Sequence, residues 1–164
     1  SITHSGTCCL AVAAHLHQMR AIGVDIEPDE DLQEMLWESV LSPGELRWLV
    51  SCPQGERGRL ARLVFSAKEA AYKCQYPLTR TLFGFEGMRI ELNLAGRCFT
   101  ALFTQSVGTF RPGDALRGRF ALDSGHILAC VTLERLPAVA RGNHGMPQEG
   151  GGRNDQSLDR LAAR

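Results

Sequence analysis

Residues 57–75 read RGRLARLVFSAKEAAYKCQ and carry the strongest structural signal in the chain. Apolar side chains recur there at helical spacing, at Leu60, Leu63, Val64, Ala67, Ala71 and Cys74. The next proline, Pro77, lies beyond this pattern. The spacing predicts a long amphipathic helix over residues 57–75 that packs its apolar stripe against the rest of the fold.

Two short apolar runs precede this helix and are expected to be strands. Residues 7–14 (TCCLAVAA) and residues 21–26 (AIGVDI) are rich in small and β-compatible side chains, and the polar stretch HLHQMR separates them. Runs of this kind are typical of strands, and the simplest arrangement places the two next to each other. Pro28 prevents further ladder pairing, so the second strand is expected to end there.

Two shorter helices are predicted between these strands and the long helix. Residues 29–31 supply capping chemistry before DLQEMLWESVL, and residues 31–41 are therefore expected to be helical. The sequence SPGE at residues 42–45 is a capping-box pattern with proline at the first helical position. It predicts a second helix over residues 42–51.

After Gly84 the hydrophobic period changes from helical to alternating. Four strand-like segments follow, divided by turn-forming residues: MRIELNL (88–94), RCFTALF (97–103), ALRGRFAL (115–122) and HILACVTLE (126–134). These segments predict an antiparallel meander.

Length and composition predict one folded domain and a tail. The 164 residues suffice for one compact domain or two small lobes, and a hydrophobic content of 44% can bury a sizeable core. Residues 137–164 contain no aromatic residue, a GGG run and scattered charges, so that a disordered tail is expected there. The domain is accordingly predicted to cover residues 1–136.

Charge and cysteine content argue against several classes of protein. Eighteen basic residues balance eighteen acidic ones, which disfavours a nucleic-acid partner. No apolar run approaches the roughly 20 residues that a membrane span requires. Six cysteines without a CxxC pair, and without a preceding signal peptide, indicate reduced core thiols in a cytoplasmic protein.

The segment GVDIE, residues 23–27, places two carboxylates on one face of a predicted strand. Alternate residues point to the same side, so Asp25 and Glu27 face one way, roughly 7 Å apart at their backbones, while Val24 and Ile26 point into the core. Mg²⁺ prefers such hard oxygen ligands. The pair predicts a metal site, and the alternative is a solvated strand end that runs into a turn.

The segment FSAKEAAYK, residues 65–73, adds Glu69 and Lys73 one helical turn apart on the same face. Glu69 is a candidate third metal ligand or proton acceptor, and Lys73 is a candidate partner for phosphate charge. Lys68 lies on a neighbouring face and is a further candidate for a phosphate contact. The alternative is an ordinary Glu-to-Lys ion pair on the helix surface.

The segment SITHS, residues 1–5, places small hydroxyls around His4 in a predicted loop before the first strand. Imidazole and hydroxyl donors in such a loop can hold a phosphate, and the alternative is a histidine satisfied within a turn. Together with the carboxylates, the segment predicts Mg²⁺-assisted transfer of a phosphate-linked group from a nucleotide-like donor.

In this order, SITHS, GVDIE and FSAKEAAYK resemble the 4′-phosphopantetheinyl transferases. The resemblance is to the siderophore-type branch, which includes the enterobactin synthase enzymes and serves nonribosomal peptide synthetases. The likeness continues through KCQYPLTRTLFGFEGMRIEL, CFTALF and GRFALDSGHILACVTL, and so covers about residues 1–133. It implies an α+β fold of two pseudo-symmetric lobes, each built from an antiparallel sheet and helices.

The resemblance also implies an activity, which is transfer of the phosphopantetheine arm of coenzyme A to a serine of an acyl or peptidyl carrier protein. Mg²⁺ would be the cofactor, coenzyme A the co-substrate and the carrier protein the partner of a monomeric enzyme. On matching positions, Asp25, Glu27 and Glu69 would hold the metal, and Glu69 and Lys73 would be catalytic. The residues expected to contact coenzyme A are Thr3, His4, Lys68 and Lys73.

Members of this family have a further N-terminal region before the segment that matches SITHS. The resemblance therefore implies that the first lobe is truncated in this sequence. One alternative reading is a catalytically silent module that binds carrier proteins without a complete coenzyme A pocket. Another is a different Mg²⁺-dependent phosphotransfer enzyme, which is disfavoured because the sequence contains no GxxxxGK[ST] phosphate loop.

Overall fold

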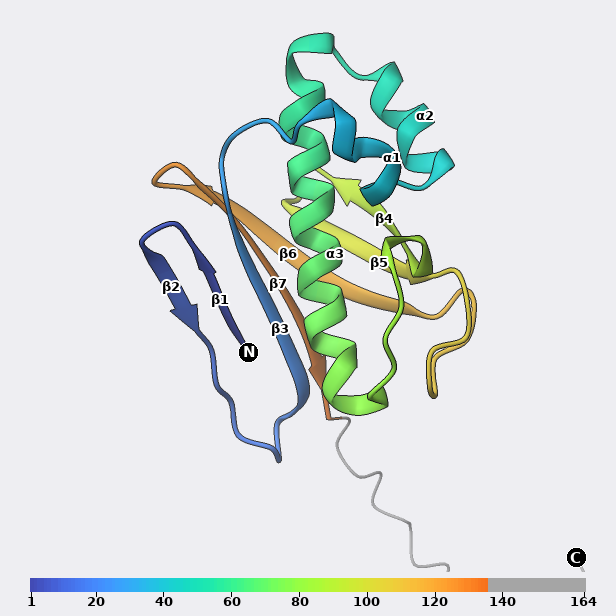
Figure 1. Cartoon of the computed structure of the whole chain (residues 1–164). Helices are drawn as coiled ribbons and strands as arrows, with labels where there is room; N and C mark the ends of the chain where they lie inside the picture. Colours follow the sequence, from blue (N-terminus) through green and yellow to red (C-terminus); the bar gives the residue numbers. More distant parts are fainter. Residues whose placement is uncertain (136–164) are drawn as a thin grey trace, which may run out of the picture.

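Helix α3, Arg57–Thr79, is the element around which the other segments are arranged (Figure 1). The computed structural model describes residues 1–135, so the predicted tail over residues 137–164 lies outside the described residues. The helix continues past the predicted end, through Pro77, because a proline in the last turn removes only one backbone donor. It ends at Arg80, which adopts the left-handed conformation with φ 54° and donates its N–H to the carbonyl of Tyr76.

A five-stranded antiparallel sheet packs against this helix in the order β3-β7-β6-β5-β4. The strands are β3 (Met19–Pro28), β4 (Met88–Asn93), β5 (Cys98–Phe103), β6 (Ala115–Asp123) and β7 (His126–Glu134). The predicted meander is confirmed, because β4 to β7 each pair with the next strand along the chain. Every second residue of β5 and of most of β6 and β7 is buried, so that one face of the sheet forms the core.

The N-terminal residues differ from the prediction. Strand β1 (Ile2–Ser5) and strand β2 (Cys8–Ala11) form a separate two-stranded hairpin, so residues 1–5 are not a loop. Gly6, with φ 55°, permits the tight turn between them. Residues 7–14 and 21–26 were expected to form neighbouring strands. This was also wrong, because β2 pairs with β1 while β3 pairs with β7.

The hairpin is attached to β3 mainly through side chains. The hydroxyl of Ser1 accepts the Val24 N–H at 3.1 Å, and the hydroxyl of Thr3 accepts the Ile26 N–H at 3.3 Å. Strand β1 therefore lies beside β3, on the side away from β7 (Figure 1).

The connection between β3 and α3 contains less helix than predicted. Residues 31–41 form only the 3₁₀ turn η1 (Glu34–Leu36) and the short helix α1 (Trp37–Val40). The Leu32 N–H bonds to the carbonyl of Gly58 at the start of α3, so residue 32 is engaged with α3 and not with a helix of its own segment. Helix α2 (Pro43–Ser51) begins with the predicted capping box.

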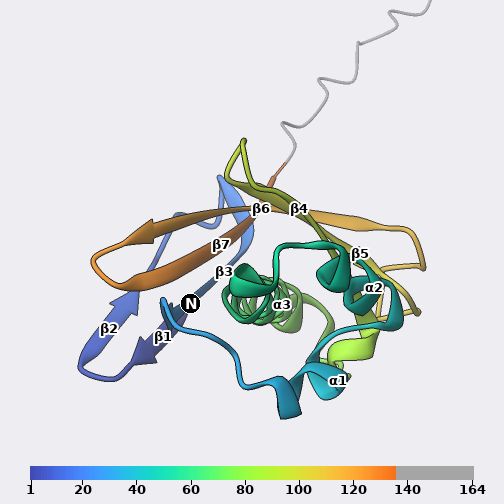
Figure 2. The same ribbon diagram turned by 90° about the horizontal axis from the view of Figure 1, so that it is seen from above.

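All described helices lie on the same face of the sheet, as the view along α3 shows (Figure 2). Two further 3₁₀ turns are η2 (Gln54–Glu56) and η3 (Phe85–Gly87). In residues 1–135, no helix is both long enough and apolar enough to cross a membrane. All six cysteines are free. Cys74 is buried in the core and Cys52 packs partly buried against it, so the prediction of core thiols was wrong for the other four.

One glycine sets the distance between α3 and β3. A Cβ atom at Gly23 would overlap the carbonyl oxygen of Ala70 and the amide nitrogen of Cys74. The two elements approach this closely because position 23 has no side chain. This close contact brings the polar face of α3 against the carboxylates of the GVDIE segment.

Candidate active site

Helix α3 presents a stripe of side chains to β3, three or four residues apart: Arg62, Phe65, Glu69 and Lys73. Asp25 and Glu27 of β3 lie opposite this stripe, since they contact Lys73 and Arg62 respectively. These two contacts join positions 35 and 48 apart in the sequence, because α3 packs along β3.

Asp25 is only 3% exposed although it carries a carboxylate. Its Oδ1 accepts hydrogen bonds from Lys73 Nζ at 2.6 Å and from the Thr3 hydroxyl at 3.1 Å. Its Oδ2 is also buried but has no hydrogen-bond partner within residues 1–135. The reading of a solvated strand end was therefore wrong, and a buried unpaired carboxylate oxygen indicates a place for a cation or donor.

Glu27, two residues further along β3, is half-buried and paired with a cation that the sequence reasoning missed. Arg62 Nη1 lies 3.0 Å from Glu27 Oε2, and Arg62 Nη2 donates to the carbonyl of Asp31 at 3.3 Å. Arg62 precedes Glu69 by seven residues, which is two helical turns on one face. That spacing was the signal that could have identified it.

The carboxylates influence one another's protonation. Burial raises the pKa of Glu27, and the neighbouring charge of Asp25 raises it further, against the opposing effect of Arg62. Burial likewise raises the pKa of Glu69, again with a contribution from Asp25 and against Lys73. Glu69 and Lys73 line the same pocket, as their shared helix face predicted, but Lys73 pairs with Asp25. The alternative of an ordinary Glu69–Lys73 ion pair is therefore wrong within the described residues.

The side chains of the pocket are of the type that binds a hard divalent cation, but they are not yet arranged around one point. Within residues 1–135, no three His, Cys, Asp or Glu side chains are already close enough to hold a metal ion. The donor set nevertheless consists of three mutually repelling carboxylates, one with a buried unpaired oxygen. Mg²⁺ prefers this kind of donor set, and its remaining ligands usually come from water and phosphate.

These residues line a pocket of about 320 Å³ between β1, β3 and α3. It contains six of the seven sequence-predicted site residues: Thr3, His4, Asp25, Glu27, Glu69 and Lys73. Glu69 also lines a smaller second pocket of about 90 Å³, together with Tyr72 and Phe83. The two pockets therefore adjoin at Glu69.

Thr3 and His4 occupy different positions within this pocket. The buried Thr3 hydroxyl donates to Asp25 and accepts from the Ile26 N–H and from Lys73 Nζ, each at 3.3 Å. Its hydrogen bonds are thus made inside the protein. His4 is exposed in the same strand and lines the pocket.

Lys68 is the predicted site residue that the structure places elsewhere. Its ammonium group lies on another side of α3, where it is 2% exposed and pairs with Glu45. The residue lines the second pocket, but its charge is held by protein acceptors and does not enter the carboxylate pocket.

A somewhat larger pocket, of about 370 Å³, lies between the first turns of α3 and strands β6 and β7. Its lining combines four leucines, Phe120 and Ile127 with three charged residues, and contains none of the predicted site residues. Its Arg59 already forms a two-point ion pair with Asp29. The candidate active site is therefore the pocket that gathers the carboxylates.

Comparisons with known proteins indicate the family of this chain. A sequence profile described as the 4′-phosphopantetheinyl transferase superfamily matches residues 21–129. The chain is 39% identical over 94 residues to 4′-phosphopantetheinyl transferase Npt of Nocardia iowensis, covering 57% of this chain and 41% of that protein. It is 29% identical over 141 residues to 4′-phosphopantetheinyl transferase PptT of Mycobacterium tuberculosis, covering 81% and 61%.

The fold also matches a solved structure. The Thermotoga maritima holo-[acyl-carrier-protein] synthase superposes with a TM-score of 0.55 at 20% identity, over 71% of this chain and 64% of that one. This likeness supports the predicted α+β fold. The chain spans 41% and 61% of the two curated relatives, and the profile covers most of the described residues. The chain thus belongs to the 4′-phosphopantetheinyl transferase superfamily.

Proposed function

We propose that this chain carries the catalytic centre of an Mg²⁺-dependent 4′-phosphopantetheinyl transferase. The reaction moves the phosphopantetheine arm of coenzyme A to a serine hydroxyl of an acyl or peptidyl carrier protein. The observation that carries the proposal is the buried, unpaired Oδ2 of Asp25 in a pocket that also holds Glu27, Glu69 and Lys73. Family membership supplies the reaction class.

The proposed metal ligands are Asp25, Glu27 and Glu69. Mg²⁺ bound to these oxygens would neutralise pyrophosphate charge and orient the phosphate to be attacked. Burial, with a further contribution from the charge of Asp25, raises the pKa of Glu27 and of Glu69, and a bound cation would relieve the repulsion between these carboxylates.

In the proposed transfer, the carrier serine oxygen attacks the phosphorus that bears the pantetheine arm. The bond from that phosphorus to the bridging oxygen breaks, and adenosine 3′,5′-bisphosphate leaves with the electron pair. Glu69 accepts the serine proton, directly or through water, and burial suits it to this task because a raised pKa makes it a stronger base. Lys73 stabilises the negative charge on the departing bisphosphate.

The two adjoining pockets suggest how the donor lies. His4 is exposed on the rim of the carboxylate pocket and is the proposed contact for the donor's phosphates. The narrower second pocket, between Tyr72 and Phe83, suits the thin pantetheine arm, with the aliphatic part of Lys68 as one wall. Thr3 supports the site by holding Asp25 and Lys73.

The finer identity rests on the three sequence segments. We place the chain in the siderophore-type branch because SITHS, GVDIE and FSAKEAAYK occur in that order. A monomer acting in the cytoplasm is proposed with it, and the six free cysteines agree with that compartment.

The test is to incubate the protein with coenzyme A, Mg²⁺ and an apo carrier protein, and to measure the intact mass of the carrier. A gain equal to one phosphopantetheine group is expected with the wild type and with Glu91→Gln, a surface carboxylate paired with Arg89 outside the pocket. Asp25→Asn and Glu69→Gln are expected to abolish most of the gain.

Two results would contradict the proposal. Tight carrier binding without any mass gain from the wild type would favour a catalytically silent carrier-binding module. Full activity in both Asp25→Asn and Glu69→Gln would instead show that the metal and base lie elsewhere.

A further inference from the structure

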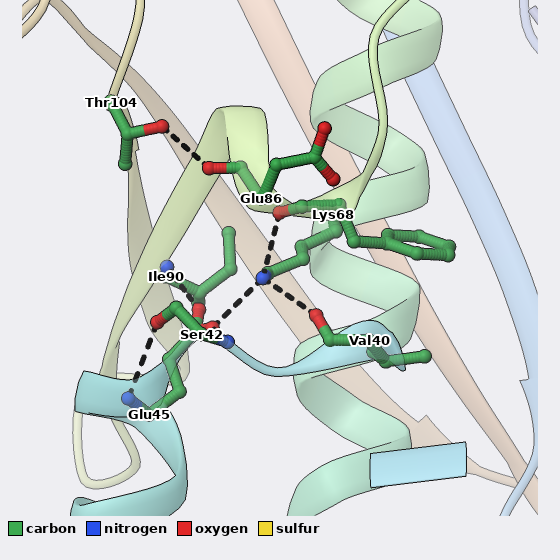
Figure 3. Close-up of polar contacts among 8 residues, drawn as sticks. Val40, Ser42, Glu45, Lys68, Glu86, Ile90 and Thr104 are labelled. Carbon is green, nitrogen blue, oxygen red and sulfur yellow. Dashed lines mark hydrogen bonds and ion pairs between the residues drawn. The ribbon is translucent and has the colours of Figure 1, made fainter. Parts of the chain in front are cut away.

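Lys68 and Glu45 form a buried ion pair that the proposed reaction does not use. The two side chains are 2% and 3% exposed, and Lys68 Nζ lies 2.8 Å from Glu45 Oε2 (Figure 3). The ammonium also donates to the carbonyl of Val40 at 2.7 Å and to the carbonyl of Phe85 at 3.0 Å. All three of its N–H donors are thus used within the protein.

Glu45 is equally well satisfied. Its Oε2 accepts the Ser42 N–H at 2.6 Å, in the capping box of α2, and its Oε1 accepts the Ile90 N–H of β4 at 2.6 Å (Figure 3). Through these contacts the pair joins the end of α1, the start of α2, the middle of α3, the Phe85 segment and β4. It is the point at which these segments are fixed to one another.

One of these contacts spans the second pocket. Lys68, Glu69 and Tyr72 on α3 form one side of that pocket, and Phe83, Gly84 and Phe85 form the other. The bond from Lys68 Nζ to the Phe85 carbonyl therefore joins the two walls.

Residues 80–84, which lead into the second wall, have no regular secondary structure. The distance between α3 and the wall formed by Phe83, Gly84 and Phe85 is therefore set by side-chain contacts such as the bond from Lys68 Nζ to the Phe85 carbonyl. The Phe65 and Phe85 rings, 5.6 Å apart at their centroids, add a contact without a fixed direction.

Stability alone does not account for an ion pair in this position. Taking two charges out of water is costly, and apolar side chains of the same volume often stabilise a fold as well or better. An ammonium with three fixed acceptors does something that an apolar group cannot, because its hydrogen bonds are directional.

We propose that Lys68 and Glu45 are positioning residues that set the width of the second pocket and so the affinity for the arm of the donor. The proposal rests on the proposed function for the identity of that donor. It concerns the wall formed by Phe83, Gly84 and Phe85, and assigns Lys68 no contact between its charge and the donor.

The test compares the full chain with the double variant Lys68→Met/Glu45→Gln. Methionine keeps the length of the lysine stem, and glutamine keeps an acceptor for the capping box without leaving a buried charge. The matched control is Leu49→Ala, a fully buried position of α2 outside the ion pair, which is expected to lower stability without altering the pocket.

Two ligands report on the two ends of the site. Coenzyme A carries the arm, whereas adenosine 3′,5′-bisphosphate lacks it. The double variant is expected to lose about tenfold in affinity for coenzyme A, while its affinity for the bisphosphate stays within about twofold of the wild type. Leu49→Ala should leave the ratio of the two affinities unchanged.

Hydrogen exchange gives a readout that needs no donor. Amides of residues 83–88 are expected to exchange at least about tenfold faster in the double variant, and not in Leu49→Ala. Unchanged exchange in this segment, or an equal loss of affinity for both ligands, would overturn the positioning role. If the wild type binds neither ligand, the proposed function fails, while faster exchange in residues 83–88 would still establish that the pair holds this wall.

Discussion

Helix α3 contributes a lysine to each of two ion pairs, and the pairs differ in what surrounds them. Lys68 and Glu45 are both almost fully buried, and every polar atom of the two side chains has a partner in the protein. Lys73 is 28% exposed, and its partner Asp25 retains a buried oxygen without one. The satisfied pair therefore fixes structure, whereas the unsatisfied pair is available to a ligand.

The difference follows from the direction in which each lysine leaves the helix. Five residues separate them, which places them about 140° apart around the axis. Lys68 points toward α1, α2 and η3, where the Val40 carbonyl, the Glu45 carboxylate and the Phe85 carbonyl accept its hydrogen bonds. Lys73 points toward β1 and β3, into the pocket where, within residues 1–135, Lys73 and Arg62 are the cations paired with its carboxylates.

The largest effect that would sharpen this comparison is expected from Asp25→Asn. Loss of the buried carboxylate should lower the rate of carrier modification by about 10³-fold, equivalent to about 4 kcal/mol of barrier. Stability should change little, because Lys73 can turn to solvent. Intact-mass kinetics and urea unfolding measure the two quantities, and a stable variant with the wild-type rate would break the comparison.

Lys68→Met should show the opposite pattern. It leaves the Glu45 carboxylate buried without its cation, and the expected loss of folding free energy is about 3 kcal/mol or more. Urea unfolding of the variant measures this loss. Arg59→Met is the control, since this arginine forms an ion pair with Asp29 but is half exposed, and it should cost less than about 1 kcal/mol. Equal losses in both variants would contradict the structural role of the buried pair.

Gly23→Ala tests the close contact that serves the carboxylate pocket. The added methyl group must displace α3 at Ala70 and Cys74, at an expected cost of about 1 to 3 kcal/mol. Activity should fall with it, because the same movement carries Glu69 and Lys73 away from Asp25.

Thiol labelling reports the same displacement. Burial raises the pKa of Cys74 to about 12, so that the thiol remains protonated and inaccessible at pH 8. Labelling of Cys74 in Gly23→Ala but not in the wild type, measured by peptide mass, would show that the helix has moved. If Gly23→Ala is fully active and Cys74 stays unlabelled, the close contact between α3 and β3 at position 23 is not required for activity.

The smallest expected effect is stabilisation by Mg²⁺. An ion that binds only the folded chain adds about 1.4 kcal/mol at ten times its dissociation constant, a rise in Tm of about 3 to 6 °C. Thermal unfolding with and without Mg²⁺ measures it. Glu91→Gln should keep the rise and Glu69→Gln should lose it, whereas an equal rise in both would place the ion outside the pocket.

Much of the fold could be predicted from local pattern. The apolar spacing of α3, the capping box of α2 and the alternation in β4 to β7 are each written within short segments. The prediction of a loop for SITHS was wrong. These residues form a strand because they pair with β2, and their polar side chains give no hydrophobic alternation from which a strand could be predicted.

The sequence allowed most residues of the candidate site to be predicted, but not which of them pair with one another. Asp25, Glu27, Glu69 and Lys73 could be named from strand and helix periodicity, and they line one pocket. The pairing of Lys73 with Asp25, 48 residues away, depends on how α3 packs on β3. The burial of Lys68 was hidden for the same reason, since Glu45 appears in the sequence only as a helix cap.

The hydroxyl groups of Ser1 and Thr3 have a consequence for how the chain behaves among its own copies. Strands β3 and β4 are the two outer strands of the five-stranded sheet, and outer strands with vacant N–H groups invite intermolecular strand addition. Side chains occupy such groups on both: Ser1 and Thr3 accept those of Val24 and Ile26, and Glu45 accepts that of Ile90. The polar atoms that organise the pocket and the buried pair therefore also occupy N–H groups at which strand addition could begin.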